Sequence, residues 1–594
     1  MYISKSRFIN WTRCPMYFPM DLKNPTGKDD IDEERERRAE MLEEMWDGAK
    51  SSGSASEEEE EFDASPSAEL EALLPYYNQV EDEALKVAKK HFHGFFQANS
   101  KDVHKQKLFK YEQNGHEYRC YVDIYNENED EINIIEVKAT TNSKYLKNKD
   151  KQKLLDRYSD VGKYPHDLAF QRFVIDHALE KAQDKHRVNY YLAVLNSEYE
   201  YDGTRDAKGN CVYNIIDGQE IITFLPMNET TADYQPIIED EIKRLEDNIS
   251  SPHDPNVKTK IGKCCAWGEN TQCVFWKYCF QTLRNVPDYN SANKYLYSHK
   301  SFTDKGIVGK YELIEAGKQT LLDVDENWLK SESQRIQRKC CATGKEHVDT
   351  EKMQYWFDQL EYPIYHFDFE TFPCPLPRFR KETPYRQSVF EFSLHIERAP
   401  GVCDKYKDNF IFLNENCDDD EREELVKAII DHFEFNEDGT LKGTMLAQNT
   451  GFEIGRLKEL AKVFPEYSDK LLAICDKSAD LIDLLKTKED FYKDAFGEVR
   501  AKAINYYHPD LSGSYSIKKT LPVLVPSLTY STLDVGNGVQ AYITYLNYDS
   551  PEPTFGKLHD KTKRQNALRT YCRQDTWAMV EILRAIRNKI KKTS

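Results

Sequence analysis

The chain has 594 residues and a formal net charge of -20 at pH 7, with 39% hydrophobic and 12% aromatic residues. This length is too great for one hydrophobic core and predicts roughly two to four domains, while the apolar content excludes a chain that is disordered throughout. No run approaches the roughly 18 apolar residues of a membrane span, and the first residues lack the continuous apolar stretch of a signal peptide. We therefore expect a cytoplasmic protein without a membrane partner. The negative charge does not exclude a polyanionic substrate, because much of it lies between Asp29 and Glu71 and nuclease sites themselves concentrate carboxylates.

The first half of the chain predicts an α/β block with an acidic insertion near its start. Serine and glutamate runs over about residues 28–75 are typical of a solvated insertion. Helical periodicity and then a period-two alternation of apolar residues follow, which predicts a helix and the strands of a meander. In chain order these are a helix over Tyr76–Phe92, strands within Leu108–Cys120, Arg119–Tyr125 and Ile132–Thr140, a helix over Asp167–Lys185 and a strand over Asn189–Ser197.

The second half predicts another α/β block after a helical linker. Residues 285–355 are polar with a helical pattern, and their lysines are scattered, which favours a spacer over a nucleic-acid contact. A short apolar strand at Tyr362–Phe369 opens the block, and a helix at Tyr571–Ile590 with a basic end closes it. The expected fold class is α/β multidomain, with domains at 1–284, 285–355 and 356–594.

Two carboxylates and a lysine form the first candidate site. Glu136 and Lys138 are two apart on a predicted strand and project from the same face, while Val137 points toward the core. Asp123, on the preceding strand, can reach the same place. Two carboxylates can hold a divalent metal, and a lysine can position or help deprotonate the attacking water. A surface strand with a Glu/Lys pair is the alternative.

This D-(x)n-E-x-K pattern resembles the PD-(D/E)xK nucleases, and the order of the surrounding elements resembles their RecB-like branch. The resemblance implies a restriction-endonuclease-like domain with a nuclease site made of the three residues just named. It implies that Glu83, on the upstream helix, is a further metal ligand, with a core-facing or capping role as the alternative. It also implies a site role for Gln171 on the downstream helix, although Ile175 stands where the branch has a tyrosine.

One early and three late cysteines, out of 14 in the chain, form the second candidate site. Cys265, Cys273 and Cys279 are interspersed with aromatic residues, which suits a buried soft-metal site, and Cys14 is the candidate fourth ligand. The set resembles that of the iron–sulfur RecB-like nucleases, although its spacing departs from their C-x2-C-x5-C. The resemblance implies a 4Fe-4S cluster that closes the domain, with zinc on the same ligands as the alternative. Structural thiols, or Cys264 in place of Cys265, also remain open.

The second block carries two carboxylates on one strand. Asp368 and Glu370 share one face, while Phe367 and Phe369 face the other way. Carboxylates side by side at a strand end repel each other, and a cation relieves that repulsion. A strand end with solvated acids is the alternative.

Two further motifs follow this strand in order. Asn449 and Glu453 are four apart at a helix start, and Tyr571 and Asp575 are four apart on the last helix and so lie on one face. The three motifs resemble the DnaQ-like exonucleases of the DEDD type, specifically the tyrosine variety. The resemblance implies an RNase H-like domain in which Asp368 and the other acids of the three motifs hold a pair of Mg²⁺ or Mn²⁺ ions. Glu453 stands where that family usually has aspartate, and Tyr571 would orient the attacking water.

The segment between the second and third motifs contains basic and aromatic residues. Lys518 and Lys519 are candidates for phosphate contacts and Tyr515 for stacking on a base, with an ordinary loop before a strand as the alternative. Asp483 is either structural or peripheral to the site.

The pairing of the two blocks resembles a bacterial nuclease family that fuses both domains, and the resemblance covers nearly the whole chain apart from the acidic insertion. It implies a metal-dependent nuclease, with an exodeoxyribonuclease acting in DNA repair or antiviral defence as the expected function. A ribonuclease remains open, because no base-reading or sugar-reading residue is legible. A nucleic-acid-binding scaffold with one decayed site also remains open, and the N-terminal site is the one expected to have decayed.

Overall fold

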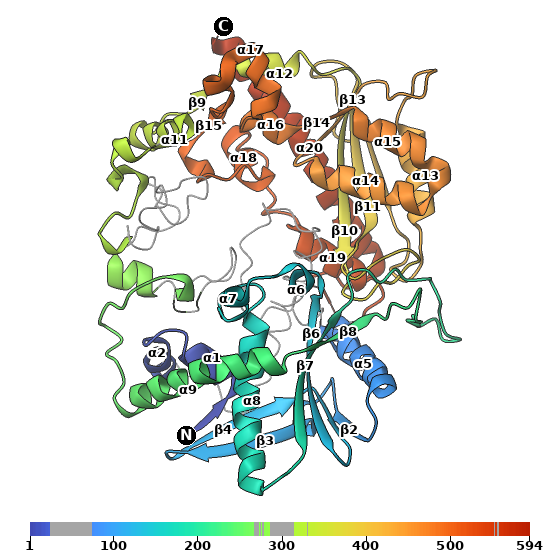
Figure 1. Cartoon of the computed structure of the whole chain (residues 1–594). Coiled ribbons are helices and arrows are strands. Elements are labelled where there is room, and N and C mark those ends of the chain that lie inside the picture. Colours follow the sequence, from blue (N-terminus) through green and yellow to red (C-terminus); the bar gives the residue numbers. More distant parts are fainter. Residues whose placement is uncertain are drawn as a thin grey trace. The chain divides into compact units, whose positions relative to one another are not determined.

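The computed structural model describes residues 1–23, 74–265, 273, 275, 278–285, 314–329, 331–551, 553–554 and 557–593. Most of the predicted acidic insertion and part of the predicted linker, including Lys300, Lys305 and Lys310, lie outside these residues. The described chain is mixed α/β and forms two compact units (Figure 1). Unit 1 contains the described residues up to Arg284 together with Pro373–Arg386, and unit 2 contains the remainder from Asn285 onward. Within the described ranges no helix combines the length and apolarity needed to cross a membrane.

Unit 1 contains a five-stranded sheet with the strand order β2-β5-β6-β7-β8. The strands are β2 (Phe95–Ala98), β5 (Ile124–Glu127), β6 (Glu131–Thr141), β7 (Arg187–Leu195) and β8 (Ile222–Pro226). β6 and β7 are parallel, and the other neighbours are antiparallel. A separate three-stranded sheet has the order β1-β4-β3, with β1 at Tyr2–Ser4, β3 at Lys107–Gln113 and β4 at His116–Val122. The prediction of one strand over Arg119–Tyr125 is therefore wrong, because the chain leaves one sheet at Val122 and enters the other at Ile124.

The helices of unit 1 include the two predicted ones. The prediction at Tyr76–Phe92 is confirmed by α5 (Leu74–His91), and the prediction at Asp167–Lys185 is confirmed by α8 (Lys163–Ala182). Leu168 and Val174 of α8 are fully buried in a core shared with Ile134 of β6. The remaining helices are α1 (Lys5–Trp11), α2 (Tyr17–Lys23), α6 (Ser143–Lys147), α7 (Lys151–Leu154) and α9 (Asn228–Ser250).

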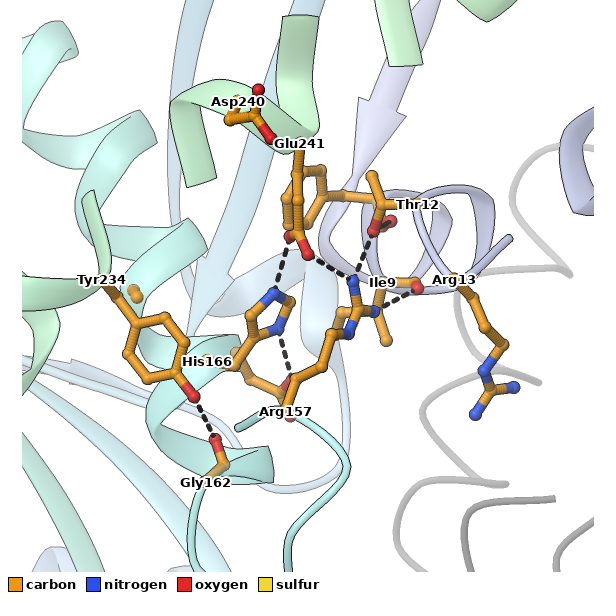
Figure 2. A network of polar contacts seen from close by, with 12 residues as sticks. Ile9, Thr12, Arg13, Arg157, Gly162, His166, Tyr234, Asp240 and Glu241 are labelled. Carbon is orange, nitrogen blue, oxygen red and sulfur yellow. Dashed lines mark hydrogen bonds and ion pairs between the residues drawn. The ribbon is translucent and has the colours of Figure 1, made fainter. Parts of the chain in front are cut away.

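A buried polar network attaches the N-terminal helix to α8 and α9 (Figure 2). Arg157 donates to Glu241 Oε1 at 3.0 Å, to Thr12 Oγ1 at 2.8 Å and to the carbonyl of Ile9 at 2.6 Å. His166 Nε2 lies 2.8 Å from the second oxygen of Glu241. Because the Glu241 carboxylate of α9 contacts both Arg157, in the connection before α8, and His166 of α8, the network ties the N-terminal segment to both helices.

Unit 2 contains a five-stranded sheet with the order β12-β11-β10-β13-β14. The strands are β10 (Ile364–Pro373), β11 (Gln387–Glu397), β12 (Asn409–Leu413), β13 (Thr444–Ala447) and β14 (Ser478–Asp480). β13 is parallel to β10 and to β14, while β11 and β12 are antiparallel. A small ladder joins β9 (His347–Val348) to β15 (Tyr506–Tyr507). The predicted strand Tyr362–Phe369 corresponds to the central strand β10.

Helices cover both faces of this sheet (Figure 1). Tyr365, Phe367 and Phe369 of β10 pack against α13 (Arg422–His432), α14 (Gly451–Val463) and α15 (Ser468–Asp476). The opposite face packs against α20 (Lys561–Thr593), which confirms the predicted final helix. The other helices are α11 (Glu332–Thr343), α12 (Thr350–Phe357), α16 (Leu481–Leu485), α17 (Glu489–Ala501), α18 (Ile517–Leu524) and α19 (Gly538–Leu546).

Candidate functional site

Unit 2 brings the acidic residues of the three C-terminal motifs into one cluster. Asp368 and Glu370 lie on the central strand β10, on the face opposite Phe367 and Phe369, because side chains alternate along a strand. Asp575 is on α20, which covers that face, and Glu453 is in the first turn of α14. Glu370, Glu453 and Asp575 are 8%, 3% and 7% exposed, respectively, and Asp368 is partly exposed.

Burial and mutual repulsion raise the pKa values of the carboxylates in this cluster. Burial, with the charge of Asp575, raises the pKa of Asp368 well above its ordinary value. Burial also raises the pKa values of Glu370 and Glu453, and the charge of Asp368 raises both further. Buried like charges of this kind are costly unless a proton or a cation compensates them. The cluster therefore has the chemistry of a cation site built from oxygen ligands.

The position of Glu453 depends on the end of strand β14. Asp480 accepts hydrogen bonds from the backbone N–H groups of Asn449 and Thr450, both at 3.0 Å, and thereby fixes the start of α14. Asn449 itself has a φ of 64°, a left-handed conformation that asparagine tolerates better than most residues. Glu453 Oε2 is buried without a hydrogen-bond partner among the described residues. This oxygen is available to a cation, which fits the metal-ligand role predicted for Glu453.

Two tyrosines lie beside Asp575. The predicted one, Tyr571, is 4% exposed, and the charges of Asp575 and Glu370 add to the effect of burial in raising its pKa. The other, Tyr530, was missed by the sequence analysis: its hydroxyl donates to Asp575 Oδ1 at 2.6 Å, and its ring centroid lies 6.1 Å from that of Tyr571. Tyr530 lies in a loop without a recognisable motif, so no local pattern could have found it.

Two further residues of the site were also missed, Glu391 and Cys572. Cys572 Sγ lies within 4.8 Å of a ligand oxygen of both Asp368 and Glu370. Glu391 is fully buried on β11, and burial raises its pKa well above the ordinary value, against the charge of Arg569 and with further contributions from the charges of Asp368 and Asp575. Cys572 is next to Tyr571 in sequence and could have been considered, whereas Glu391 lies on a strand without a motif.

Of the residues predicted to contact nucleic acid between the second and third motifs, Lys518 lies near the acidic cluster, whereas Tyr515 is buried. Lys518, at the start of α18, is close enough for its charge to lower the pKa values of Asp368 and Glu370, against the larger effect of burial. Tyr515 is only 2% exposed and donates its hydroxyl hydrogen to the Tyr506 carbonyl, so the expected stacking on a base is wrong for this conformation. Asp483 pairs with Lys488 at 3.0 Å.

In unit 1, Glu136, Lys138 and Gln171 meet as predicted, together with Lys5. Glu136 Oε1 accepts from Lys5 Nζ at 2.7 Å and lies 3.0 Å from Lys138 Nζ, while Oε2 accepts from Gln171 Nε2 at 2.6 Å. Burial raises the pKa of Glu136, but the charges of the two lysines outweigh it, so the net pKa is below the ordinary value. Burial raises the pKa of Asp167, one turn before Gln171, but a hydrogen bond from His166 and the charges of Lys138 and Lys5 outweigh it, so its net pKa is below the ordinary value. The Glu136 carboxylate is thus already compensated by the cationic side chains of Lys5 and Lys138.

Asp123 lies beside the strand that bears Glu136 and also lines a cavity. Its Oδ2 accepts from the backbone N–H of Val137 at 2.9 Å, which places it beside the Glu136 strand as predicted. The cavity has a volume of about 280 Å³ and is lined by Glu81, Asp82, Leu85, Ala98, Asn99, Ser100, Lys101, Asp123 and Ile124. The α5 carboxylates on this cavity are Glu81 and Asp82, whereas Glu83 is not part of the lining and forms an ion pair with Lys86. The structure therefore does not bring the predicted ligand Glu83 together with Asp123 at this cavity.

The four predicted cluster ligands surround a second cavity of about 20 Å³ in unit 1. Cys14 follows α1, and Cys265 and Cys279 lie on the short helical segments η2 (Lys263–Cys265) and η3 (Tyr278–Thr282). All of these, together with Cys273 and Cys264, line the cavity. A hydrogen bond from Cys264 lowers the pKa of Cys265 to about 7, while burial raises the pKa of Cys273 to about 12. Among the described cysteines, no three sulfurs lie within 4.8 Å of one another.

The structure thus defines a mixed α/β protein of two units with a buried acidic cluster on the central strand of the second unit. Residues 365–516 match the family model described as "Domain of unknown function (DUF2779)", a range that includes Asp368, Glu370 and Glu453 but ends before α20.

Two curated proteins are similar to parts of the chain. Uncharacterized protein UU173 of Ureaplasma parvum is 28% identical over 244 residues, which is 38% of this chain and 31% of that protein. Uncharacterized protein MG366 of Mycoplasma genitalium is 27% identical over 257 residues, 41% of this chain and 34% of that protein. The chain therefore spans about a third of the length of these relatives.

Proposed function

We propose that the chain is a metal-dependent nuclease that hydrolyses DNA, with its principal active site in unit 2. The observation that carries this proposal is the convergence of four carboxylates from three elements: Asp368 and Glu370 on β10, Glu453 on α14 and Asp575 on α20. The raised pKa values of Asp368, Glu370 and Glu453, and the absence of a hydrogen-bond partner for Glu453 Oε2 among the described residues, fit Mg²⁺ or Mn²⁺, which prefer carboxylate oxygens.

The fold proposed for unit 2 is RNase H-like, of the type found in DnaQ-like exonucleases. In support of this fold, strand β10, which bears the first motif, is central in the sheet. Helix α20, which bears the last motif, packs against the face of the sheet that carries Asp368 and Glu370. A bound metal pair would activate water and stabilise the leaving oxygen of a phosphodiester. Tyr571 and Tyr530 are both beside Asp575; in this proposal Tyr571 would orient the water and Tyr530 would hold the Asp575 carboxylate. Lys518 would meet the phosphate.

Unit 1 is proposed to be a RecB-like PD-(D/E)xK domain, and its site is the weaker candidate for catalysis. The adjacent Asp123 and Glu136 strands and the Gln171 helix support this fold. However, both oxygens of Glu136 are engaged by Lys5, Lys138 and Gln171. A cation at Glu136 would have to displace Lys5, so we expect unit 1 to contribute less hydrolysis than unit 2.

We further propose that the cysteine cavity of unit 1 holds a structural 4Fe-4S cluster. Three thiolates on one zinc ion, with Zn–S bonds of about 2.3 Å, lie within roughly 4 Å of one another, and no three of these sulfurs lie within 4.8 Å. Wider spacing suits a cluster whose core lies between its thiolates. Anaerobically purified protein should contain iron and acid-labile sulfide, and both should be lost in Cys14→Ser but retained in Cys475→Ser. Zinc without labile sulfide would contradict this proposal.

Degradation of end-labelled DNA and RNA, single- and double-stranded, in Mg²⁺ or Mn²⁺ tests the nuclease proposal. Asp368→Asn is expected to remove most hydrolysis, and Glu136→Gln to remove little, because the Glu136 carboxylate is already compensated by lysines. If Glu136→Gln loses hydrolysis while Asp368→Asn retains it, the principal active site lies in unit 1 instead. Cleavage of RNA alone would make the protein a ribonuclease, and no cleavage of any substrate would contradict the enzymatic proposal.

A further inference from the structure

A buried thiol takes part in the acidic cluster of unit 2. Cys572 Sγ and one carboxylate oxygen each of Asp368 and Glu370 lie within 4.8 Å of one another. Cys572 is fully buried and precedes Asp575 on α20 by three positions, so the two share a face of the helix. Two carboxylates and a sulfur at this separation are a possible set of three ligands for one ion.

The register between β11 and α20 places Glu391 beside this thiol. Ser393 Oγ and His395 Nδ1 lie 2.7 and 2.8 Å from Thr576 Oγ1, and further along Arg587 contacts Glu397 at 2.5 Å. Strand and helix therefore progress in the same direction. Alternation along the strand puts Glu391 on the face of Ser393, and one helical turn before Thr576 is Cys572.

Glu391 is an independent indication that a ligand belongs here. It is fully buried, and neither of its carboxylate oxygens has a hydrogen-bond partner among the described residues. A buried ionised carboxylate without hydrogen bonds is costly, and a bound cation is one of the few groups that removes the cost. The charges of Arg569 and Arg573 lower the pKa of Glu391, but burial still keeps it well above the ordinary value, so these arginines do not fully compensate the carboxylate and a cation beside Cys572 would.

We infer that Asp368, Glu370 and Cys572, with Glu391 beside them, form a mixed sulfur–oxygen site for a thiophilic divalent cation of the zinc class. A thiolate ligand selects zinc-class ions over Mg²⁺, whose ligands are oxygen atoms. Binding releases the thiol proton to solvent as the sulfur–metal bond forms.

The regulatory consequence rests on the proposed function. A zinc-class ion on Asp368 and Glu370 excludes Mg²⁺ or Mn²⁺ from the same oxygens, so it holds the nuclease inactive. Removal of Cys572 should raise the Zn²⁺ concentration that half-inhibits hydrolysis by about tenfold or more, the scale of affinity loss seen when a metal site loses a supporting group.

The test of the site itself is ¹¹³Cd NMR of the full chain, because the cadmium chemical shift reports the number of sulfur ligands. Wild type should show a resonance typical of one sulfur with oxygen ligands, separate from any signal of the cysteine cavity in unit 1. This resonance should vanish in Cys572→Ser, vanish in Asp368→Asn and weaken in Glu391→Gln. It should persist in Cys475→Ser, which replaces a cysteine that is 7% exposed in α15, away from the acidic cluster.

Absence of this resonance in folded wild type overturns the inference, whatever the variants do. Its persistence in Cys572→Ser, with the fold verified by circular dichroism, overturns it as well. Hydrolysis assays in Mn²⁺ without zinc separate the two proposals. A resonance in a protein that cleaves nothing would leave the cation site standing and remove the nuclease. Protein that cleaves nucleic acid but lacks the resonance would leave the nuclease proposal standing and remove the mixed sulfur–oxygen site.

Discussion

Asp368→Asn is expected to remove most hydrolysis and, in the absence of divalent cations, to increase the stability of the protein. Loss of a metal ligand removes several kcal/mol of transition-state stabilisation, so activity should fall by about 10³ or more. The metal-free fold, however, holds the partly exposed Asp368 near Asp575, and desolvation together with the charge of Asp575 raises its pKa. Neutralising it should increase the free energy of unfolding by about 0.5–2 kcal/mol. A merely structural aspartate would show the opposite effect on stability.

The pH dependence of stability tests the same point. A carboxyl whose pKa is raised on folding binds more protons in the folded than in the unfolded state, so stability falls as pH rises from its ordinary pKa through the raised one. The pKa values of Asp368, Glu370 and Glu453 are all raised. The contribution of these three carboxyls to the stability of the metal-free protein should therefore fall as pH rises above about 4, where aspartate and glutamate ordinarily titrate, and the difference between wild type and Asp368→Asn should show this fall. Saturating Mn²⁺ should remove this loss.

Thermal melts and hydrolysis assays on wild type and Asp368→Asn give both readouts. Asp494→Asn is the matched control, because Asp494 is exposed on α17 and should change neither quantity. Mn²⁺ at about a hundred times its dissociation constant should stabilise wild type by about 2.7 kcal/mol and Asp368→Asn far less. Activity within tenfold of wild type, or equal Mn²⁺ stabilisation of both proteins, would remove Asp368 from the metal site.

Glu241→Gln is expected to destabilise unit 1 by about 3–5 kcal/mol, the cost of breaking a buried ion pair on one side. Glu241 is 6% exposed and contacts both Arg157 and His166 (Figure 2), so the substitution leaves the guanidinium without its carboxylate. The same arginine donates to Thr12 and to the Ile9 carbonyl, so the N-terminal helix should loosen too. Urea denaturation measures the loss of stability. Faster amide hydrogen exchange in Lys5–Trp11 would show that the N-terminal helix has loosened.

The pH dependence of this effect has a defined sign. Burial raises the pKa of Glu241, but the His166 hydrogen bond and the Arg157 charge outweigh it and lower the pKa to about 2. A lowered pKa stabilises the fold above the ordinary glutamate value, and the contribution disappears as pH falls from about 4.5 to about 2. The difference between wild type and Glu241→Gln should shrink over that interval. Glu239→Gln, at an exposed position of the same helix, is the control, and equal stability of the two variants would contradict the prediction.

The sequence by itself determined the features that depend on local periodicity. Alternation along a strand places Asp368 and Glu370 on one face, and the four-residue spacing places Tyr571 and Asp575 on one side of α20. Both arrangements need only neighbouring residues, so they could be predicted before any fold was known. The same holds for Glu136 and Lys138 on β6. The residue of α5 that faces Asp123 could not be obtained in this way, because two acids two apart on a helix point in different directions, and the cavity lining includes Glu81 but not Glu83.

Only the tertiary structure decided which distant groups complete each site. Lys5 is 131 positions from Glu136, and Tyr530 is 45 from Asp575, so no local pattern relates them. The position of Glu391 beside Cys572 depends on the alignment of β11 with α20. Side-chain contacts such as the one between Ser393 and Thr576 determine that alignment. The sequence specifies the ligand types through residue identity and spacing. Burial and long-range packing determine the charges around them, because desolvation and Coulomb interactions depend on distances in space rather than along the chain.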